Sequence, residues 1–244
     1  MKPQTKPAPR TTCRRLLSSD LSTLDALAQV SLPAAARPSF AELHAALEQG
    51  ELWGWWRADI LICGVILLPL DAPCRLCIDT AVLTGISGLS PDRLLLLWAP
   101  AVRDADDAIL NAVAQLALER AAARRRTGVL AAFPVRARAG MGSFFSAGFQ
   151  LVGLRPLLRL CPCLLLLAPG QKTDYNKGHQ LRLDLTDTRL LGRRLEEGWR
   201  GVALEPDGSL LLIRCAITRE TPGLQEEPNE AGNSGLVRTH GGRS

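Results

Sequence analysis

A strand–helix–strand unit between positions 94 and 133 constrains the fold of this chain more than any other segment. Leu94 to Trp98 is a short, wholly apolar run, which is typical of a strand that is covered on both faces. From about Asp106 to Arg125, apolar residues recur every three or four positions, and this spacing predicts a long helix. Val129 to Phe133 is a second apolar run. Two buried strands joined by a long helix indicate an α/β domain.

Shorter elements are predicted on both sides of this unit. Two helices and a Trp-rich hairpin precede it, and a short helix and two strands follow it. The predicted helices are 20–31, Phe40–Gln49 (with Ser39 as N-cap and Glu42 in a capping box) and Ser143–Ala147. The predicted strands are the hairpin Leu52–Leu70, which turns at Ala58-Asp59, and then Phe149–Val152 and Leu157–Leu167, while residues 71–92 are irregular.

Composition divides the chain into four segments. We expect a disordered basic tail over 1–19, an α/β domain over 20–170, an appendage over 171–218 that packs on the domain, and a disordered tail over 219–244. The last tail has almost nothing to bury.

The appendage is predicted to mix helix and strand. Its helix is Thr188–Glu197, and its strand-like pieces are Gln180–Leu185, Val202–Leu204 and Leu210–Cys215. Pro206-Asp207-Gly208 is a turn signal, which makes a hairpin of Val202–Cys215.

Charge and hydropathy narrow the function classes. The formal net charge is +5, and the first fifteen residues hold five basic residues and no acid. We interpret this as a solvated tail rather than an anchor for nucleic acid or anionic lipid, because no aromatic residues alternate with the charges. The longest apolar run, Ile60 to Leu68, is about half of what a membrane span needs. No secretory signal is visible, so we expect a cytoplasmic protein without nucleic-acid or membrane partners.

Seven cysteines raise the question of a metal site. Cys74-x-x-Cys77 and Cys161-Pro-Cys163 together carry as many thiolates as a structural zinc site needs. The second spacing is wrong for a zinc knuckle, and a strand would point both of its sulfur atoms to one face. We therefore predict no metal. An odd cysteine count without a signal peptide indicates reduced, buried thiols.

The order and lengths of the central elements resemble those of the GNAT (N-acetyltransferase) superfamily. That signature is a strand, a tight loop, a long helix, a strand and a short helix that runs into Gly-Phe. In this chain these are Leu94–Trp98, Pro100–Ala108, Ala108–Arg125, Val129–Phe133 and Ser143–Phe149. The resemblance implies a GNAT-like α/β fold: a central mixed, twisted sheet flanked by helices, with a small C-terminal α+β appendage.

The resemblance also implies acetyl-CoA, or another acyl-CoA, as cosubstrate. Backbone N–H groups at the start of the long helix would hold its pyrophosphate, because they are unpaired and carry positive partial charge. The family writes this loop as Arg or Gln, two residues, Gly, one residue, then Gly or Ala, and Arg103 and Ala108 match its ends. The residues that the resemblance assigns to acyl-CoA are Trp98, Ala99, Pro100, Arg103, Asp104, Ala105, Asp106, Asp107, Ala108 and Phe144.

The loop departs from the family pattern in its charge. Asp106 stands at the central glycine, Asp104 stands where many relatives carry another glycine, and Asp107 is adjacent. Two like charges about 4 Å apart repel by about 1 kcal/mol in water and by about 4 kcal/mol at an effective dielectric of about 20. The sequence therefore predicts a damaged acyl-CoA phosphate loop.

The catalytic residues are left unassigned. Phe144 occupies the position where many family members place a Tyr that protonates the leaving thiolate. Glu51 and Asp79 are the acids near the substrate-side strands, and we expect both at surface or turn positions. His44 falls on a predicted helix and is interpreted as structural.

Two functions remain open at this stage. The first is an N-acyltransferase that moves an acetyl (acyl) group from acyl-CoA to an unknown amine on a small molecule or a protein. The alternative is a non-catalytic GNAT-like protein that acts as a binding or interaction module. Trp53, Trp55 and Trp56 are candidates for an acceptor pocket, although packing in a strand core is the commoner role of Trp.

Overall fold

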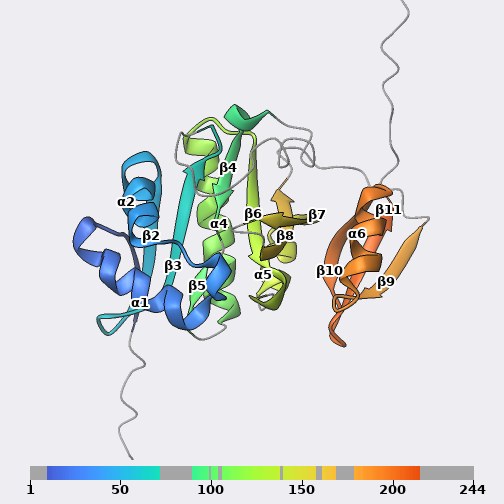
Figure 1. Ribbon diagram of the computed structural model, residues 1–244, viewed down its shortest axis with the longest axis horizontal. Coiled ribbons are helices and arrows are strands. Elements are labelled where there is room, and N and C mark those ends of the chain that lie inside the picture. The colour runs from blue at the N-terminus through green and yellow to red at the C-terminus, as the bar shows by residue number, and fades with distance from the viewer. Residues whose placement is uncertain are drawn as a thin grey trace, which may run out of the picture.

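A mixed sheet forms the centre of the protein, and helices cover both of its faces (Figure 1). The computed structural model describes residues 10–71, 90–98, 100–103, 106–137, 140–157, 161–168 and 179–214. Within these ranges the sheet has eleven strands in the order β1-β2-β3-β4-β6-β8-β7-β10-β11-β9, and β5 pairs with β3 beside this path. The α/β class and the central mixed sheet flanked by helices are thus confirmed.

The elements have the following bounds. The strands are β1 (Thr11–Arg15), β2 (Glu51–Arg57), β3 (Ile60–Pro69), β4 (Leu94–Leu97), β5 (Ala101–Val102), β6 (Gly128–Pro134), β7 (Gln150–Leu157), β8 (Cys161–Ala168), β9 (Gln180–Asp184), β10 (Trp199–Leu204) and β11 (Ser209–Arg214). The helices are α1 (Leu21–Ser31), α2 (Phe40–Gln49), α4 (Asp107–Ala123), α5 (Met141–Ser146) and α6 (Thr188–Glu196). Short 3-10 turns lie at Ser18–Asp20, Ala34–Ala36, Pro91–Arg93 and Val135–Ala137.

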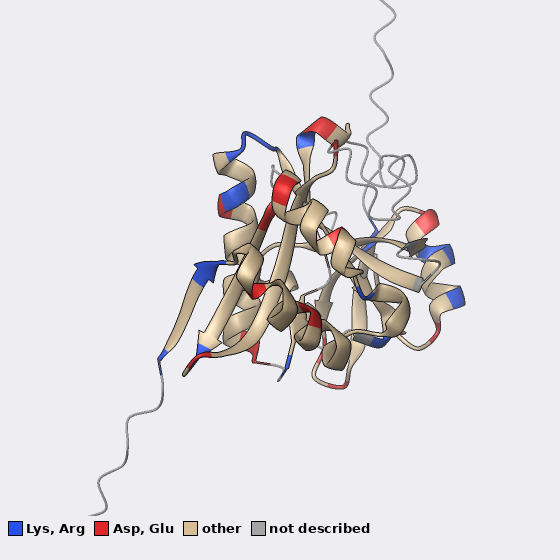
Figure 2. Cartoon of the chain, turned by 60° about the vertical axis from the view of Figure 1, so that its left-hand side comes forward, with Lys and Arg blue, Asp and Glu red and all other residues tan. Residues whose placement is uncertain are grey.

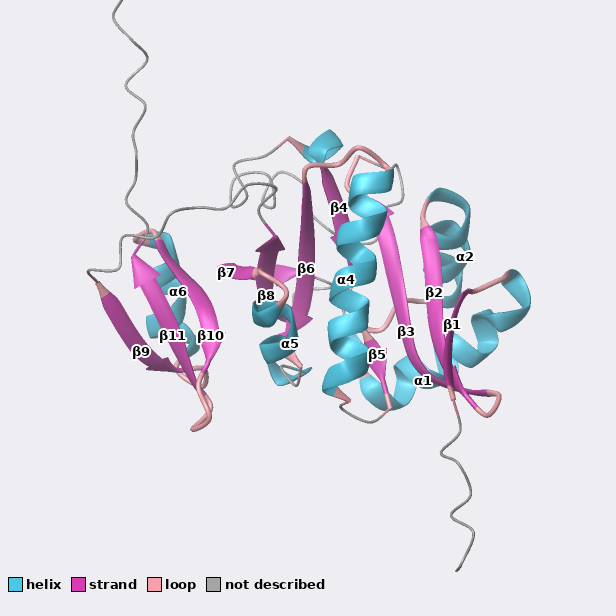
Figure 3. Cartoon of the chain, turned by 180° about the vertical axis from the view of Figure 1, so that it is seen from behind, coloured by secondary structure: helices cyan, strands magenta, loops and turns pink. Residues whose placement is uncertain are grey.

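Two apolar cores lie on opposite faces of the sheet. Alternate residues of a strand point to opposite faces, so Leu95 and Leu97 of β4 join the core under α4 and α5, whereas Leu94 and Leu96 join the core under α1 and α2. Figure 3 shows α4 and α5 on one side of the sheet and α1 and α2 on the other. The central strands β3, β4 and β6 contain no charged residue, and they are uniformly tan in Figure 2.

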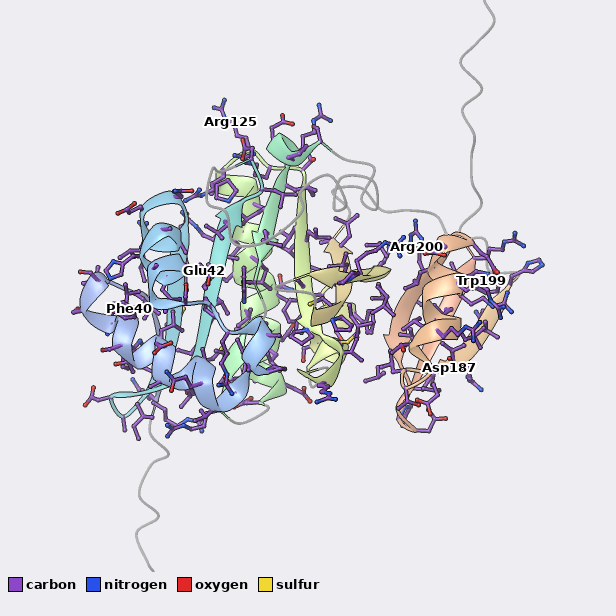
Figure 4. The ribbon with its side chains drawn as sticks, viewed as in Figure 1. Phe40, Glu42, Arg125, Asp187, Trp199 and Arg200 are labelled. Carbon is purple, nitrogen blue, oxygen red and sulfur yellow. The ribbon has the colours of Figure 1, made fainter. Side chains whose placement is uncertain are left out.

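Two local predictions near the N-terminal half are confirmed. Ser39 caps α2, where its hydroxyl accepts from the Glu42 N–H at 3.3 Å while the Glu42 carboxylate accepts from the Ser39 N–H at 2.6 Å. Phe40 and Glu42 mark this first turn in Figure 4. Ala58 and Asp59 have φ angles of 47° and 65°, which is the backbone of a tight hairpin turn between β2 and β3.

The first strand corrects the expectation of a disordered tail over 1–19. Residues 11–15 pair with β2 from Thr11↔Arg57 to Arg15↔Trp53. The Arg14 guanidinium lies 4.4 Å from the centre of the Trp56 ring and forms an ion pair with Asp20 at 2.8 Å. All five residues of β1 are exposed, so an edge strand of this kind has no apolar pattern by which the sequence could reveal it.

The C-terminal appendage extends the same sheet. β10 reaches β7 at Gly201↔Leu151, and β11 and β9 follow beyond it. A Cβ atom at Gly201 would lie 2.9 Å from the Leu151 Cβ, so the close approach of these two strands requires glycine. Apolar side chains of the appendage complete the core under α4 and α5; they include Leu183, Leu191, Leu195, Leu210 and Leu212. Residues 171–178 and 215–244 lie outside the described ranges.

A buried carboxylate joins β2 to the end of α4. Glu51, which the sequence suggested to be a surface or turn residue, is 2% exposed. Its oxygens accept from Arg120 Nε at 2.8 Å, Arg124 Nε at 2.9 Å and Trp53 Nε1 at 2.9 Å. Burial by itself raises the pKa of Glu51, but these hydrogen bonds outweigh it and lower the pKa from 4.5 to about 2.

Glu51→Gln is expected to lower the free energy of unfolding at pH 7 by about 3 kcal/mol, because it removes the counter-charge of a largely buried ion-pair network. The pKa of the folded state lies below the ordinary value, so the stability that Glu51 contributes is complete above about pH 4.5 and is lost as the pH falls toward about 2. Urea unfolding from pH 7 to pH 2 should therefore show the difference between the two proteins shrinking over that range.

The matched control is Glu119→Gln, which removes an exposed charge from α4, the helix that carries Arg120, and should change stability by less than about 0.5 kcal/mol. A Glu51→Gln protein as stable as the wild type at pH 7 would contradict the role given to this network.

Candidate functional site

The strands β4 and β6 separate partway along the sheet. They pair in parallel from Leu94↔Gly128 to Leu97↔Ala131, and the pairing ends there. β6 continues to Pro134 with β8 as its partner, whereas the chain after β4 stays beside β3 through Gly64↔Ala101 and Cys63↔Val102. Trp98 and residues 100–102 therefore diverge from residues 132–134, and neither stretch has a sheet partner on its facing side within the described ranges.

A one-residue bulge produces this divergence. From the pair Leu67↔Leu97 to the pair Gly64↔Ala101, β3 advances by three residues while the segment paired with it advances by four. The Trp98 N–H still donates to Ile66 O at 3.0 Å, so the change of register lies between Trp98 and Ala101. A bulge bends its strand and increases the local twist, which turns this end of the strand away from β6.

A carboxylate caps the helix that follows the bulge. Asp106 is the N-cap of α4, and its Oδ1 accepts from Ala108 N at 3.0 Å and from Ile109 N at 3.4 Å. Its Oδ2 accepts from Arg57 Nη2 at 3.2 Å. The amides that the sequence assigned to a pyrophosphate are thus bonded to a side chain of the protein itself.

The neighbouring loop residues lie around this cap. Arg103 is exposed, and its N–H donates to Ile62 O at 3.0 Å. Asp107 begins the helix and accepts from the Ser143 hydroxyl, through both its carbonyl oxygen and Oδ1, at 3.3 Å. Ala99, Asp104 and Ala105 lie outside the described ranges.

Arg57 is the member of this site that sequence reasoning missed. It lies at the end of β2, 49 positions before Asp106, and only the pairing of β2, β3 and β5 brings it to the start of α4. No motif spans that separation, so no local signal predicts the contact.

Two residues assigned to acyl-CoA have buried side chains. Trp98 is 3% exposed in the core under α1 and α2, and its Nε1 donates to Ala36 O at 3.1 Å. Phe144 is fully buried, with its ring in edge-on contact with Phe133 at 4.9 Å and Phe149 at 5.1 Å. The Phe144 side chain is therefore part of the core, and its predicted contact with a ligand stays a prediction.

The side of the bulge under α1 holds little free space. A cavity of about 10 Å³ lies there, and the described residues around it are apolar or glycine, among them Leu24, Gly64 and Trp98. This volume accommodates roughly one water molecule. Trp55 is buried in the opposite core, the Trp53 ring faces Arg120 at 5.8 Å, and Trp56 stacks with Arg14. Structural packing therefore accounts for all three hairpin tryptophans.

The parts of the chain that the structure describes hold no group of three or more His, Cys, Asp or Glu residues that suits a metal ion. Cys74 and Cys77 lie outside them. Burial raises the pKa of the Cys63 thiol, which keeps that sulfur protonated. Among the described helices, none is long and apolar enough to cross a membrane.

Comparison with known proteins identifies the fold. No protein-family model matches the sequence, and no curated protein sequence matches it either. Among solved structures, a probable acetyltransferase from Staphylococcus epidermidis ATCC 12228 is 13% identical, with a TM-score of 0.50 over 66% of this chain and 100% of that one. An N-acetyltransferase from Staphylococcus aureus Mu50 is 11% identical, with a TM-score of 0.50 over 66% and 98% of the two chains. The chain has the fold of the GNAT acetyltransferases, which confirms the resemblance at the level of fold.

Phe144→Tyr tests whether a proton donor fits at that position. We expect the change to lower the free energy of unfolding by roughly 1–3 kcal/mol, because it places a hydroxyl among aromatic rings without a hydrogen-bond partner. Phe40→Tyr is the control, since Phe40 is 48% exposed on α2, and it should be nearly neutral. Thermal or urea unfolding measures both. A fully stable Phe144→Tyr protein would show that the site offers the hydroxyl a partner or water.

Proposed function

We propose that this protein binds an acyl thioester of the acyl-CoA type between the diverging strands and transfers the acyl group to an amine. The observation that carries the proposal is the divergence of Trp98 and residues 100–102, which precede α4, from residues 132–134 at the end of β6. Backbone N–H and C=O groups without a partner strand require hydrogen bonds from elsewhere. An extended pantetheine arm, which contains amide groups, can supply them in the manner of an added strand.

The chemistry fits a mechanism that depends on position rather than on side-chain acids or bases. A backbone N–H at the diverging edge would polarise the thioester carbonyl. The amine nitrogen attacks that carbon, the C–N bond forms, the C–S bond breaks, and the proton of the amine passes to the leaving thiolate or to water. Among the described residues, Phe144 has no proton to give, and Glu51 is held as a carboxylate by its arginines. Orientation of the two reactants then supplies most of the rate.

A second candidate is a non-catalytic protein that keeps the fold as a binding or interaction module. It is retained because Asp106 occupies two amides at the start of α4. The acyl acceptor, whether a small molecule or a protein, belongs to the first candidate alone. A cytoplasmic location and the absence of a nucleic-acid partner remain predictions under both.

Calorimetric titration with acetyl-CoA separates the two candidates. The acyltransferase proposal expects a Kd of about 100 μM or tighter, near −5.5 kcal/mol. Hydrogen exchange measured with and without the ligand should then show added protection in peptides that cover 98–103 and 128–134, where the strands diverge. The peptide that covers α6, residues 188–196, is the internal control and should not change.

Absence of heat at millimolar acetyl-CoA, with a protein that still unfolds cooperatively, would argue against the acyltransferase and support the second candidate. Binding with protection confined to other segments would also count against it, because the ligand would then lie away from the diverging strands.

A further inference from the structure

The start of α4 is already occupied by an anion. One oxygen of Asp106 accepts from Ala108 N and Ile109 N, and the other accepts from Arg57. A helix N-terminus attracts phosphate because its first N–H groups are unpaired. At the start of α4 the carboxylate has taken both the hydrogen bonds and the favourable interaction with the helix dipole.

A pyrophosphate would meet further obstacles at this position. To reach the amides of α4 it must displace Asp106, and its negative charges would then face the Asp106 and Asp107 carboxylates at close range. Arg57 favours the present arrangement, because its ion pair holds Asp106 over the amides. Arg57 is therefore a positioning residue for the cap. The diverging strands are not part of this contact, since among the described residues the cap involves only Arg57, Ala108 and Ile109.

We propose that the acyl donor is recognised through its pantetheine arm, and that a nucleotide pyrophosphate contributes no affinity. The ligand class is a pantetheine thioester without the pyrophosphate of CoA. This inference rests on the proposed function, because it places the thioester between the same diverging strands. It differs in what holds the donor: backbone edges at residues 98–102 and 132–134, and no phosphate cradle.

The test compares two donors that differ only beyond the pantetheine arm. S-acetylpantetheine and acetyl-CoA are titrated into the full chain at about 0.15 M salt, where charges are screened beyond about 8 Å. We expect their Kd values to agree within about threefold. An acetyl-CoA Kd more than tenfold tighter, about 1.4 kcal/mol, would overturn the inference and leave the proposed function intact. If neither thioester binds to the folded protein, the proposed function fails, and the inference fails with it.

Asp106→Gly supplies an independent test. Glycine is an acceptable N-cap and uncovers the amides of Ala108 and Ile109, so the preference for acetyl-CoA over S-acetylpantetheine should rise at least tenfold. The control is Asp59→Gly, which removes one nearby negative charge at a turn position with φ 65° that suits glycine. An equal rise in both variants would show that net charge rather than the cap governs donor choice. An unchanged ratio in a folded Asp106→Gly protein would also contradict the proposal.

A free pantetheine thioester and one that is attached to a carrier protein present the same pantetheine arm to the diverging strands. Titration with an acetylated carrier protein distinguishes these sources. A Kd tighter than that of S-acetylpantetheine identifies a protein-borne donor, and an equal or weaker Kd identifies a free thioester.

Discussion

The early end of the β4–β6 pairing is the constraint on which the rest of this structure depends. Four parallel residue pairs hold the two central strands together, from Leu94↔Gly128 to Leu97↔Ala131. The bulge after Trp98 then keeps one strand beside β3 while the other stays beside β8. Because α4 connects these two strands, the path of the chain after β4 determines where the helix begins. The unpaired edge after β4 leads directly into the first turn of α4, whereas the edge on β6 follows the end of the helix.

Asp106 stabilises α4 by bonding to the same amides that could otherwise bind a phosphate. A side-chain oxygen at the N-cap satisfies helix N–H groups and contributes about 0.5–2 kcal/mol to stability. The same hydrogen bonds remove the groups that would otherwise receive a phosphate. Arg57 supports this cap, because its guanidinium forms an ion pair with the Asp106 carboxylate. A chain with this cap keeps the GNAT fold and its diverging strands, while its own carboxylate bonds to two amides at the start of α4.

The appendage alters the edge of the sheet. An exposed edge strand offers unpaired backbone groups to other chains, and proteins commonly cover it. β10 pairs with β7 at one position, and α6 lies against the remainder of that strand, where Arg155 forms an ion pair with Glu196 at 3.0 Å. The leucines of α6, β9 and β11 share one core with the aromatic cluster around Phe144. The appendage is therefore a continuous part of the domain rather than a separate unit.

Local pattern was sufficient for much of the fold. Several elements can be predicted from neighbouring residues, because each depends on hydrogen bonds or burial within a few positions. They are the apolar runs at 94–98 and 129–133, the helical spacing of α4, the Ser39 capping box and the turn at Ala58-Asp59. The departure of Asp106 from the family loop is visible for the same reason, because the loop pattern covers only residues 103–108. The sequence by itself thus determined the fold class, the position of the long helix and the presence of an acid at its start.

Tertiary structure alone decided which distant groups meet. Arg57 reaches Asp106, Arg120 and Arg124 reach Glu51, and Arg14 stacks on Trp56, all across strand pairings whose register no local pattern specifies. β1 was missed because an exposed edge strand needs no apolar alternation, and Glu51 was misjudged because its burial depends on arginines about 70 positions away. Contacts of this kind arise from long-range packing, in which the partner rather than the residue itself determines whether a charge can be buried.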